Sequence, residues 1–276
     1  MVFTTANAVD IFAANRATGH IALGVGAENG RSHRTRVHEE GSLRIRFPGR
    51  TADALEAMVV NTAGGMTGGD RFAIDLDLGP ASQLVATTVA AEKIYRSTGA
   101  DAETAITLTV GDNARLVWLP QETILFDRAR LTRCIDVALS ESASLIMAEA
   151  VVFGRTAMGE ILRDGFFADR WRVRRGDRLA YADSVRLDGS IAEKLRHRAV
   201  AAGGLAIASA LIAPSSGEAV EAVRALDQRF AGEVGISAWN DLAAVRFCAH
   251  DGAALRHDLI AVLAALGVSV PRIWLQ

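Results

Sequence analysis

The stretch NTAGGMTGGDRFAIDLDL, residues 61–78, contains the two patterns that decide the fold. In its second half, apolar side chains stand at every other position from Phe72 to Leu78, with Asp75 among the residues between them. This alternation predicts a half-buried β-strand, because successive side chains of a strand point to opposite faces. Its first half holds two Gly-Gly pairs, which predict a turn in which backbone approaches backbone closely.

The glycine-rich half does not match a phosphate-binding loop. Such loops require GxxxxGK[ST] between a strand and a helix, or GxGxxG at the start of a helix. Here Asp70 follows the second Gly-Gly pair, and a strand follows Asp70. A carboxylate would repel a phosphate group, so we expect the glycines to shape the backbone and to present Asp70 at the end of the turn.

The same alternation recurs along most of the chain, separated by Gly, Pro, Asp and Asn turn signals, at residues 43–47, 106–110, 135–139 and 171–173. Helical periodicity appears only at residues 218–230 and 251–267, the second with Asp251 as its expected N-cap. Strands without helices between them predict a mainly β fold of packed antiparallel sheets, β-sandwich or β-helix-like, with two helices near the C-terminus. We expect a single domain over residues 1–276.

Composition excludes several classes of protein. The 276 residues carry 30 basic and 32 acidic side chains, a net charge of −2 that gives no footprint for nucleic acid. Cys134 and Cys248 are too far apart for a zinc motif or a disulfide framework, which favours a reducing compartment. Asp10 interrupts the only candidate signal peptide, and the weakly polar run 199–213 is too short to span a bilayer. We therefore expect a cytoplasmic protein without a membrane partner, with residues 199–213 as a candidate surface for a protein partner.

Acidic residues are the remaining candidates for chemistry, since the HExxH and GxSxG motifs are absent. Six acids lie in segments that are otherwise small and apolar: Asp70, Glu92, Glu122, Asp127, Glu149 and Glu160. A carboxylate is costly to bury unless it is paired, hydrated or in contact with a cation. The many arginines of the chain make an ion pair the simplest expectation at each position.

Six segments give the chain a family resemblance: NTAGGMTGGD (61–70), TTVAAEKIYRS (87–97), WLPQETILFD (118–127), EAVVFGRTAMGE (149–160), DRWRVRR (169–175) and PRIW (271–274). In this order and spacing they resemble the urease accessory protein UreD family, called UreH in some bacteria. The resemblance extends from about Gly41 to the C-terminus. No single segment is decisive, because glycine-rich turns are common, but six in order are specific.

The resemblance implies an assembly factor rather than an enzyme, with no catalytic residues and no tightly bound cofactor. Proteins of this family are mostly β and join a helical accessory protein, UreF, and a GTPase, UreG. The complex docks on apo-urease and helps deliver nickel to its dinuclear active site. A water-filled passage through the UreD protein is thought to carry Ni²⁺ transiently.

A nickel route gives the acids a second meaning. Weak oxygen donors suit such a route, because thiolates would trap the ion. Carboxylates lower the electrostatic cost of moving a dication through a medium of low dielectric, and binding must stay weak enough for release. By motif position and chemistry, the candidates for transient nickel contact are Asp70, Glu92, Glu149 and Glu160.

Two alternatives remain open from the sequence. One is a small-molecule hydrolase or isomerase on a β scaffold, with Glu122 and Asp127, or Glu149 and Glu160, as an acid–base pair. That reading requires both carboxylates of a pair to converge on one pocket, with their pKa values pushed apart. The other is a protein-binding β-sandwich with no role in metal transfer.

Overall fold

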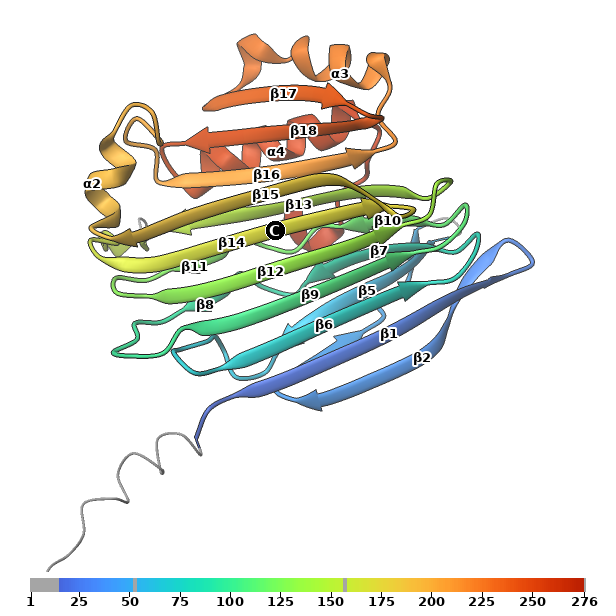
Figure 1. The fold of residues 1–276 in the computed structure, drawn as a ribbon, viewed down its shortest axis with the longest axis horizontal. Coiled ribbons are helices and arrows are strands. Elements are labelled where there is room, and N and C mark those ends of the chain that lie inside the picture. The colour runs from blue at the N-terminus through green and yellow to red at the C-terminus, as the bar shows by residue number, and fades with distance from the viewer. Residues whose placement is uncertain (1–14, 52–53, 156–157, 276) are drawn as a thin grey trace, which may run out of the picture.

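A computed structural model describes residues 15–51, 54–155 and 158–275 of the chain. Asp10, which carries the expectation about a signal peptide, lies outside these residues. Two β-sheets stack face to face, and the helices near the C-terminus cover the outer side of the second sheet (Figure 1). The mainly β architecture of packed sheets is confirmed.

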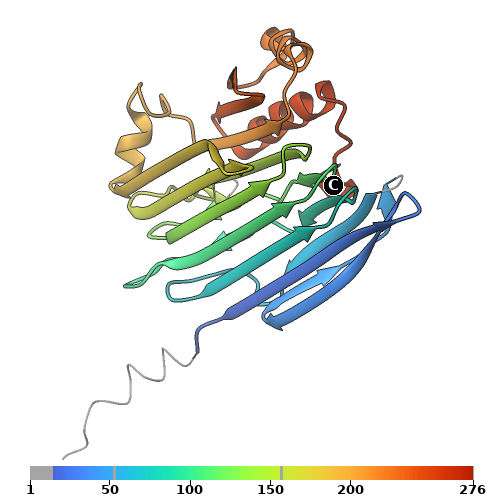
Figure 2. The same cartoon turned by 45° about the vertical axis from the view of Figure 1, so that its right-hand side comes forward.

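Within the described residues the first sheet has seven strands, whose colours run in chain order from the blue β1–β2 hairpin to the yellow β15 in Figure 2. Their spatial order is β15 (Arg178–Gly189), β14 (Gly165–Arg175), β12 (Arg130–Leu139), β9 (Ala102–Val110), β6 (Arg71–Leu78), β1 (Thr18–Glu28) and β2 (Arg31–Gly41). The alternation expected from the sequence at residues 72–78, 106–110, 135–139 and 171–173 forms β6, β9, β12 and β14.

The second sheet runs in the order β17 (Glu233–Trp239), β18 (Leu242–Ala249), β16 (Ala206–Ala213), β13 (Ser144–Phe153), β10 (Arg115–Trp118), β7 (Gln83–Thr88), β5 (Ala54–Asn61) and β3 (Leu43–Arg46). Three short strands join it: β4 (Arg50–Thr51), β8 (Glu92–Ile94) and β11 (Thr123–Leu125). Strand β11 pairs with both β13 and β8.

Most neighbouring strands inside the two sheets run parallel, so the expected antiparallel pairing is wrong there. Strand β6 pairs in parallel with β1 and β9, and β7 pairs in parallel with β5 and β10. Antiparallel pairs, such as β1–β2, β14–β15 and β16–β18, lie toward the ends of the sheets. From β5 to β14 the chain passes back and forth between the sheets, so a strand of the opposite sheet supplies the long crossover that parallel neighbours need. The β-helix-like alternative is the better description of this part.

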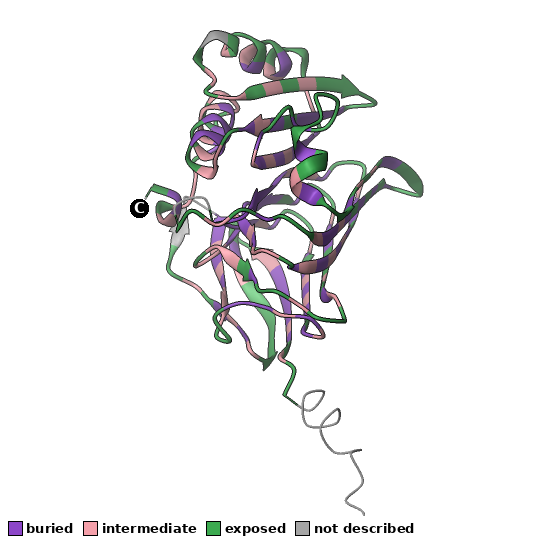
Figure 3. Ribbon diagram, turned by 90° about the vertical axis from the view of Figure 1, so that its left-hand side faces the viewer, coloured by how far each residue is buried: buried purple, intermediate pink, exposed green. Residues whose placement is uncertain are grey.

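Apolar side chains fill two layers, seen in Figure 3 as purple segments on facing strands. Between the sheets lie the inward positions of the alternating strands, among them Leu76 and Leu108. Behind the second sheet, α4 (Gly252–Ala265) packs Leu255 and Leu259 against that sheet. Because the first sheet has a solvated outer face, its inner strands β6, β9, β12 and β14 alternate, whereas β13 of the second sheet is almost completely buried.

The two helices expected near the C-terminus lie where the sequence predicted them, but they differ in length from the prediction. Asp251 caps α4, its side chain accepting a hydrogen bond from the backbone N–H of Ala254 at 2.8 Å. The helix expected over 218–230 is shorter: α3 spans Gly217–Arg224, and a 3₁₀ turn follows at Asp227–Arg229. A short helix, α2 (Ile191–Arg196), was not expected. No helix in the described ranges has the length and hydropathy of a membrane span.

The expected partner surface at residues 199–213 is wrong for its larger part. Residues 206–213 form β16, which lies inside the second sheet between β13 and β18. Six of its eight residues are buried, between the first sheet on one side and the α4 layer on the other, and the remaining two, Ile207 and Ser209, are half-buried. Its low polarity therefore reflects burial within the protein.

The glycine-rich turn connects β5 of the second sheet to β6 of the first, and its glycines shape the backbone as expected. Gly65 has φ of +144°, and a Cβ there would lie 2.8 Å from the carbonyl oxygen of Lys93. A Cβ on Gly68 would lie 2.3 Å from the carbonyl oxygen of Ala100. These contacts leave no room for a side chain, so the turn can approach the neighbouring backbone this closely only with glycine at these positions.

Candidate functional site

The space between the two sheets contains a cavity of about 260 Å³, here called the intersheet cavity. Its wall takes residues from both sheets, including Ile74 and Leu131 from the first and Val59 and Trp118 from the second. Polar side chains interrupt this apolar wall at several positions: Asn61, Thr88, Glu92, Lys93, Thr104, Gln121, Thr123, Arg133 and Glu149. Two carboxylates, those of Glu92 and Glu149, therefore line the same cavity.

Glu92 begins β8, directly beneath the glycine-rich turn. Its Oε1 accepts a hydrogen bond from Asn61 Nδ2 at 2.9 Å. Burial raises the pKa of Glu92 from 4.5 to about 7, while the Asn61 hydrogen bond opposes this and the Asp70 charge adds to it. Near neutral pH the carboxyl group is thus present in both protonated and ionised forms, which an ordinary glutamate is not.

Glu149, on β13, lies in a buried group that we call the Arg133 cluster: Arg133, Glu149, Asp169, Trp118 and Trp171. The guanidinium of Arg133 contacts both carboxylates, with Nη2 donating to Asp169 Oδ2 at 2.6 Å. Trp118 Nε1 donates to Glu149 Oε1 at 2.7 Å. The side chains of Arg133 and Glu149 are 4% and 3% exposed, so each polar group depends on these partners.

The Arg133 cluster contains more acidic than basic groups. Burial alone would lower the pKa of Arg133, but the carboxylates of Asp169 and Glu149 reverse this and hold it above its ordinary value. Burial raises the pKa of Glu149, against the opposing effects of Arg133 and of the Trp118 N–H. Two carboxylates face one guanidinium, which leaves an excess of negative charge at the wall of the cavity when both are ionised.

The other two nickel candidates lie outside the lining of this cavity. Asp70 is buried at the end of the glycine turn, where its carboxylate accepts backbone N–H groups from Ala17 at 2.8 Å and Thr67 at 2.7 Å. Glu160 pairs with the surface residue Arg155, whose Nε lies 2.5 Å from Glu160 Oε2. The structure thus accounts for both residues with local contacts, and it brings together only Glu92 and Glu149.

Neither acid–base pair expected for a hydrolase or isomerase converges. Glu122 pairs with Arg256 of α4 at 2.7 Å, whereas Asp127 accepts the backbone N–H of Arg163 at 2.7 Å. In the second pair, Glu149 faces the cavity and Glu160 faces Arg155. The two carboxylates of each pair contact different partners and do not converge on one pocket. The geometry therefore does not support the hydrolase or isomerase hypothesis.

Several residues of the site were not singled out from the sequence. Asn61 and Trp118 lie inside the segments that carry the family resemblance, but Arg133 lies outside all six. Its signal was available: Arg133 is two positions before Ile135, so the alternation of β12 places it on the inward face. An arginine at an inward strand position needs buried acceptors, which here are Glu149 and Asp169.

The cysteines take no part in the cavity wall. Cys134 and Cys248 are both free thiols, as the sequence indicated, and neither lies among its lining residues. The polar groups of the cavity are therefore oxygen and nitrogen donors of carboxyl, amide, hydroxyl and cationic side chains. Of these, the carboxylates are the natural ligands for a divalent cation.

Comparison with known proteins assigns the chain to a family. The profile described as UreD urease accessory protein matches residues 17–275. A protein of Rhodopseudomonas palustris (strain BisA53), named urease accessory protein UreD, is 53% identical over 273 residues, covering 99% of this chain and 96% of the relative. A protein of the same name from Bradyrhizobium diazoefficiens is 54% identical over 266 residues, covering 96% of each chain. The chain belongs to the UreD family of urease accessory proteins, which serve urease maturation and are not enzymes.

Proposed function

We propose that this protein is a cytoplasmic scaffold that joins UreF-like and UreG-like partners and passes nickel to apo-urease. The observation that carries the metal-transfer part is the intersheet cavity, whose wall contains both Glu92 and Glu149. Nickel is cargo in this proposal: the ion contacts the cavity in transit and is not retained as a cofactor.

Glu92 has the properties that a transient contact needs. An ionised carboxylate attracts Ni²⁺, but an oxygen donor binds it less firmly than a thiolate would. Because burial raises the pKa of Glu92 to about 7, a proton competes with the ion under neutral conditions. A contact of this kind admits a cation and also releases it, which is the requirement for any conducting path.

Glu149 contributes in a different way. Its two oxygens are occupied by Arg133 and Trp118, so a direct contact with nickel would require one of these bonds to open. The excess negative charge of the Arg133 cluster acts without such a change, because a carboxylate in low dielectric attracts a dication over several ångströms. In the proposal, Glu92 contacts the ion and Glu149 contributes charge.

The test is co-expression of the Glu92→Gln chain with urease and the accessory partners. We expect the accessory complex to assemble, and the nickel bound per purified urease to fall. The matched control is Glu103→Gln, the same change at a glutamate that is 51% exposed on β9. Unchanged nickel in the Glu92→Gln sample would contradict the metal-transfer part. Loss of the complex together with the nickel would assign Glu92 a role in assembly instead.

A further inference from the structure

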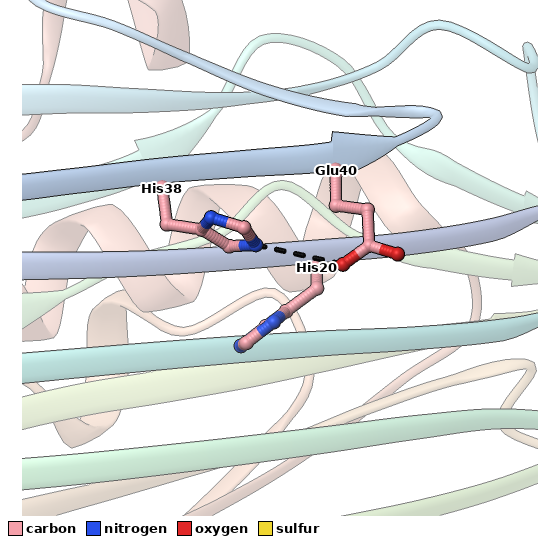
Figure 4. Close-up of side chains that lie close together, drawn as sticks. All are labelled: His20, His38 and Glu40. Atoms are coloured by element: carbon pink, nitrogen blue, oxygen red, sulfur yellow. Dashed lines mark ion pairs between the residues drawn. The ribbon is translucent and has the colours of Figure 1, made fainter.

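A second group of possible metal ligands lies on the outer face of the first sheet, away from the intersheet cavity. His20, His38 and Glu40, here called the hairpin cluster, lie close together on the β1–β2 hairpin, with His38 and Glu40 pointing toward each other (Figure 4). One donor atom of each lies within 4.8 Å of the other two. The imidazole rings of His20 and His38 are 5.2 Å apart, and His38 Nε2 lies 3.5 Å from Glu40 Oε2.

Strand register places these side chains on one face. His20 is paired with Glu40 across the hairpin, and His38 is two positions before Glu40 on β2. The neighbours of His20 in the alternation, such as Ile21, point into the core between the sheets. The side chains of the cluster are therefore open to solvent, with exposures of 36% for His20, 49% for His38 and 69% for Glu40.

A third strand orients one of the histidines. On β6, the parallel neighbour of β1, Asp75 Oδ2 lies 2.8 Å from His20 Nε2. A carboxylate that accepts the Nε2–H of a histidine fixes the ring and leaves Nδ1 with its lone pair free for a metal ion. His20 and Glu40 also line a surface hollow of about 360 Å³, which gives room for water or a further ligand.

We propose that His20, His38 and Glu40 bind one divalent transition-metal ion, with Asp75 as a positioning residue for His20. Two imidazole nitrogens and one carboxylate oxygen are a donor set that suits Ni²⁺ and Zn²⁺. Two neutral imidazoles with the carboxylates of Glu40 and Asp75 give a charge of −2, which balances a divalent ion. This site is separate from the proposed nickel contact at Glu92, and neither depends on the other.

The test is calorimetric titration of the untagged full chain with Ni²⁺ and with Zn²⁺. We expect one ion to bind at the hairpin cluster, with its Kd raised at least about tenfold in His38→Ala and about 10–100-fold in Asp75→Asn. The matched control is His33→Ala, a histidine on the same strand outside the cluster, which should bind as the wild type does. X-ray absorption of the Ni²⁺-loaded chain should show imidazole ligands that are lost in His38→Ala.

Three results would overturn the proposal: no binding to the wild-type chain, equal Kd values for wild type and His38→Ala, or equal weakening in His33→Ala. The Glu92→Gln chain should still bind this ion, so failure here is distinguishable from failure of the nickel-transfer proposal. His38 is exposed and Asp75 is half-buried on the outer face of the sheet, so neither change should disturb folding. The unfolding transition of each variant, measured without metal, should therefore match that of the wild type.

Discussion

Glu92 and Glu149 line the same cavity, but their surroundings differ. Glu149 has a guanidinium and an indole N–H as partners, and its charge is part of a closed ionic group. Among the described residues, the side-chain hydrogen-bond donor to Glu92 is the neutral amide of Asn61, and burial raises the pKa of Glu92 to about 7. Burial raises the pKa of both carboxyl groups, and at Glu149 an adjacent guanidinium opposes this rise. Substitutions in the two regions should therefore have different effects: removing the cation of the Arg133 cluster should lower stability, whereas neutralising Glu92 should change how stability depends on pH.

The largest effect is expected for Arg133→Met. This change leaves the carboxylates of Glu149 and Asp169 buried without their cation, which costs about 3–5 kcal/mol of the free energy of unfolding. Urea denaturation of the purified chain measures this loss. Arg172→Met, on the outward face of β14, is the control and should change stability by less than about 0.5 kcal/mol. A stable Arg133→Met protein would mean that Glu149 and Asp169 do not need the cation of Arg133 to remain buried.

Glu92→Gln should have a smaller effect on the free energy of unfolding. At alkaline pH it should raise this free energy, whereas Arg133→Met lowers it. The raised pKa means that the native state holds this proton more tightly than the unfolded chain does. The resulting stabilisation is fully present below pH 4.5 and is lost as the pH rises through about 7. Moving a pKa from 4.5 to about 7 corresponds to about 3 kcal/mol at most. At pH 8 the Glu92→Gln chain should therefore be the more stable one.

Urea unfolding at pH 5 and at pH 8 checks this prediction. The difference in stability between the two pH values should be smaller in Glu92→Gln than in the wild type. If both proteins lose the same free energy over this interval, the native state does not raise the pKa of Glu92.

The smallest effect is expected for Glu160→Gln. Glu160 pairs with Arg155 at the surface, and water and salt screen such a pair, so the midpoint of urea unfolding should not move. Because Glu160 lies outside the intersheet cavity, nickel bound per urease in co-expression should also be unchanged. A fall in nickel would extend the route beyond the two acids of the cavity.

The sequence predicted the elements of this fold better than their pairing. Alternation identified strands such as β6, because a half-buried strand must place apolar residues on one face only. The direction of pairing depends on where each crossover travels, and residues 61–70 alone do not show that the next strand lies in the other sheet. The polarity of residues 206–213 likewise fits a strand covered on both faces as well as a docking surface.

The site was predictable in part. The motif segments pointed to Glu92 and Glu149, and these are the acids that share the cavity. The same reasoning also selected Asp70 and Glu160, since motif position does not reveal what each carboxylate contacts. Only the fold shows that backbone N–H groups satisfy Asp70 and that Arg155 satisfies Glu160.

The most direct test of the central claim is Ni²⁺ binding to the purified chain as a function of pH, measured with and without Glu92→Gln. Both proteins should carry His38→Ala, so that the hairpin cluster does not contribute. With a pKa of about 7, the ionised fraction of Glu92 rises roughly tenfold between pH 6 and pH 8. We expect a comparable rise in Ni²⁺ affinity for the chain that keeps Glu92, and no such rise for the Glu92→Gln chain. The same pH dependence in both proteins would contradict it.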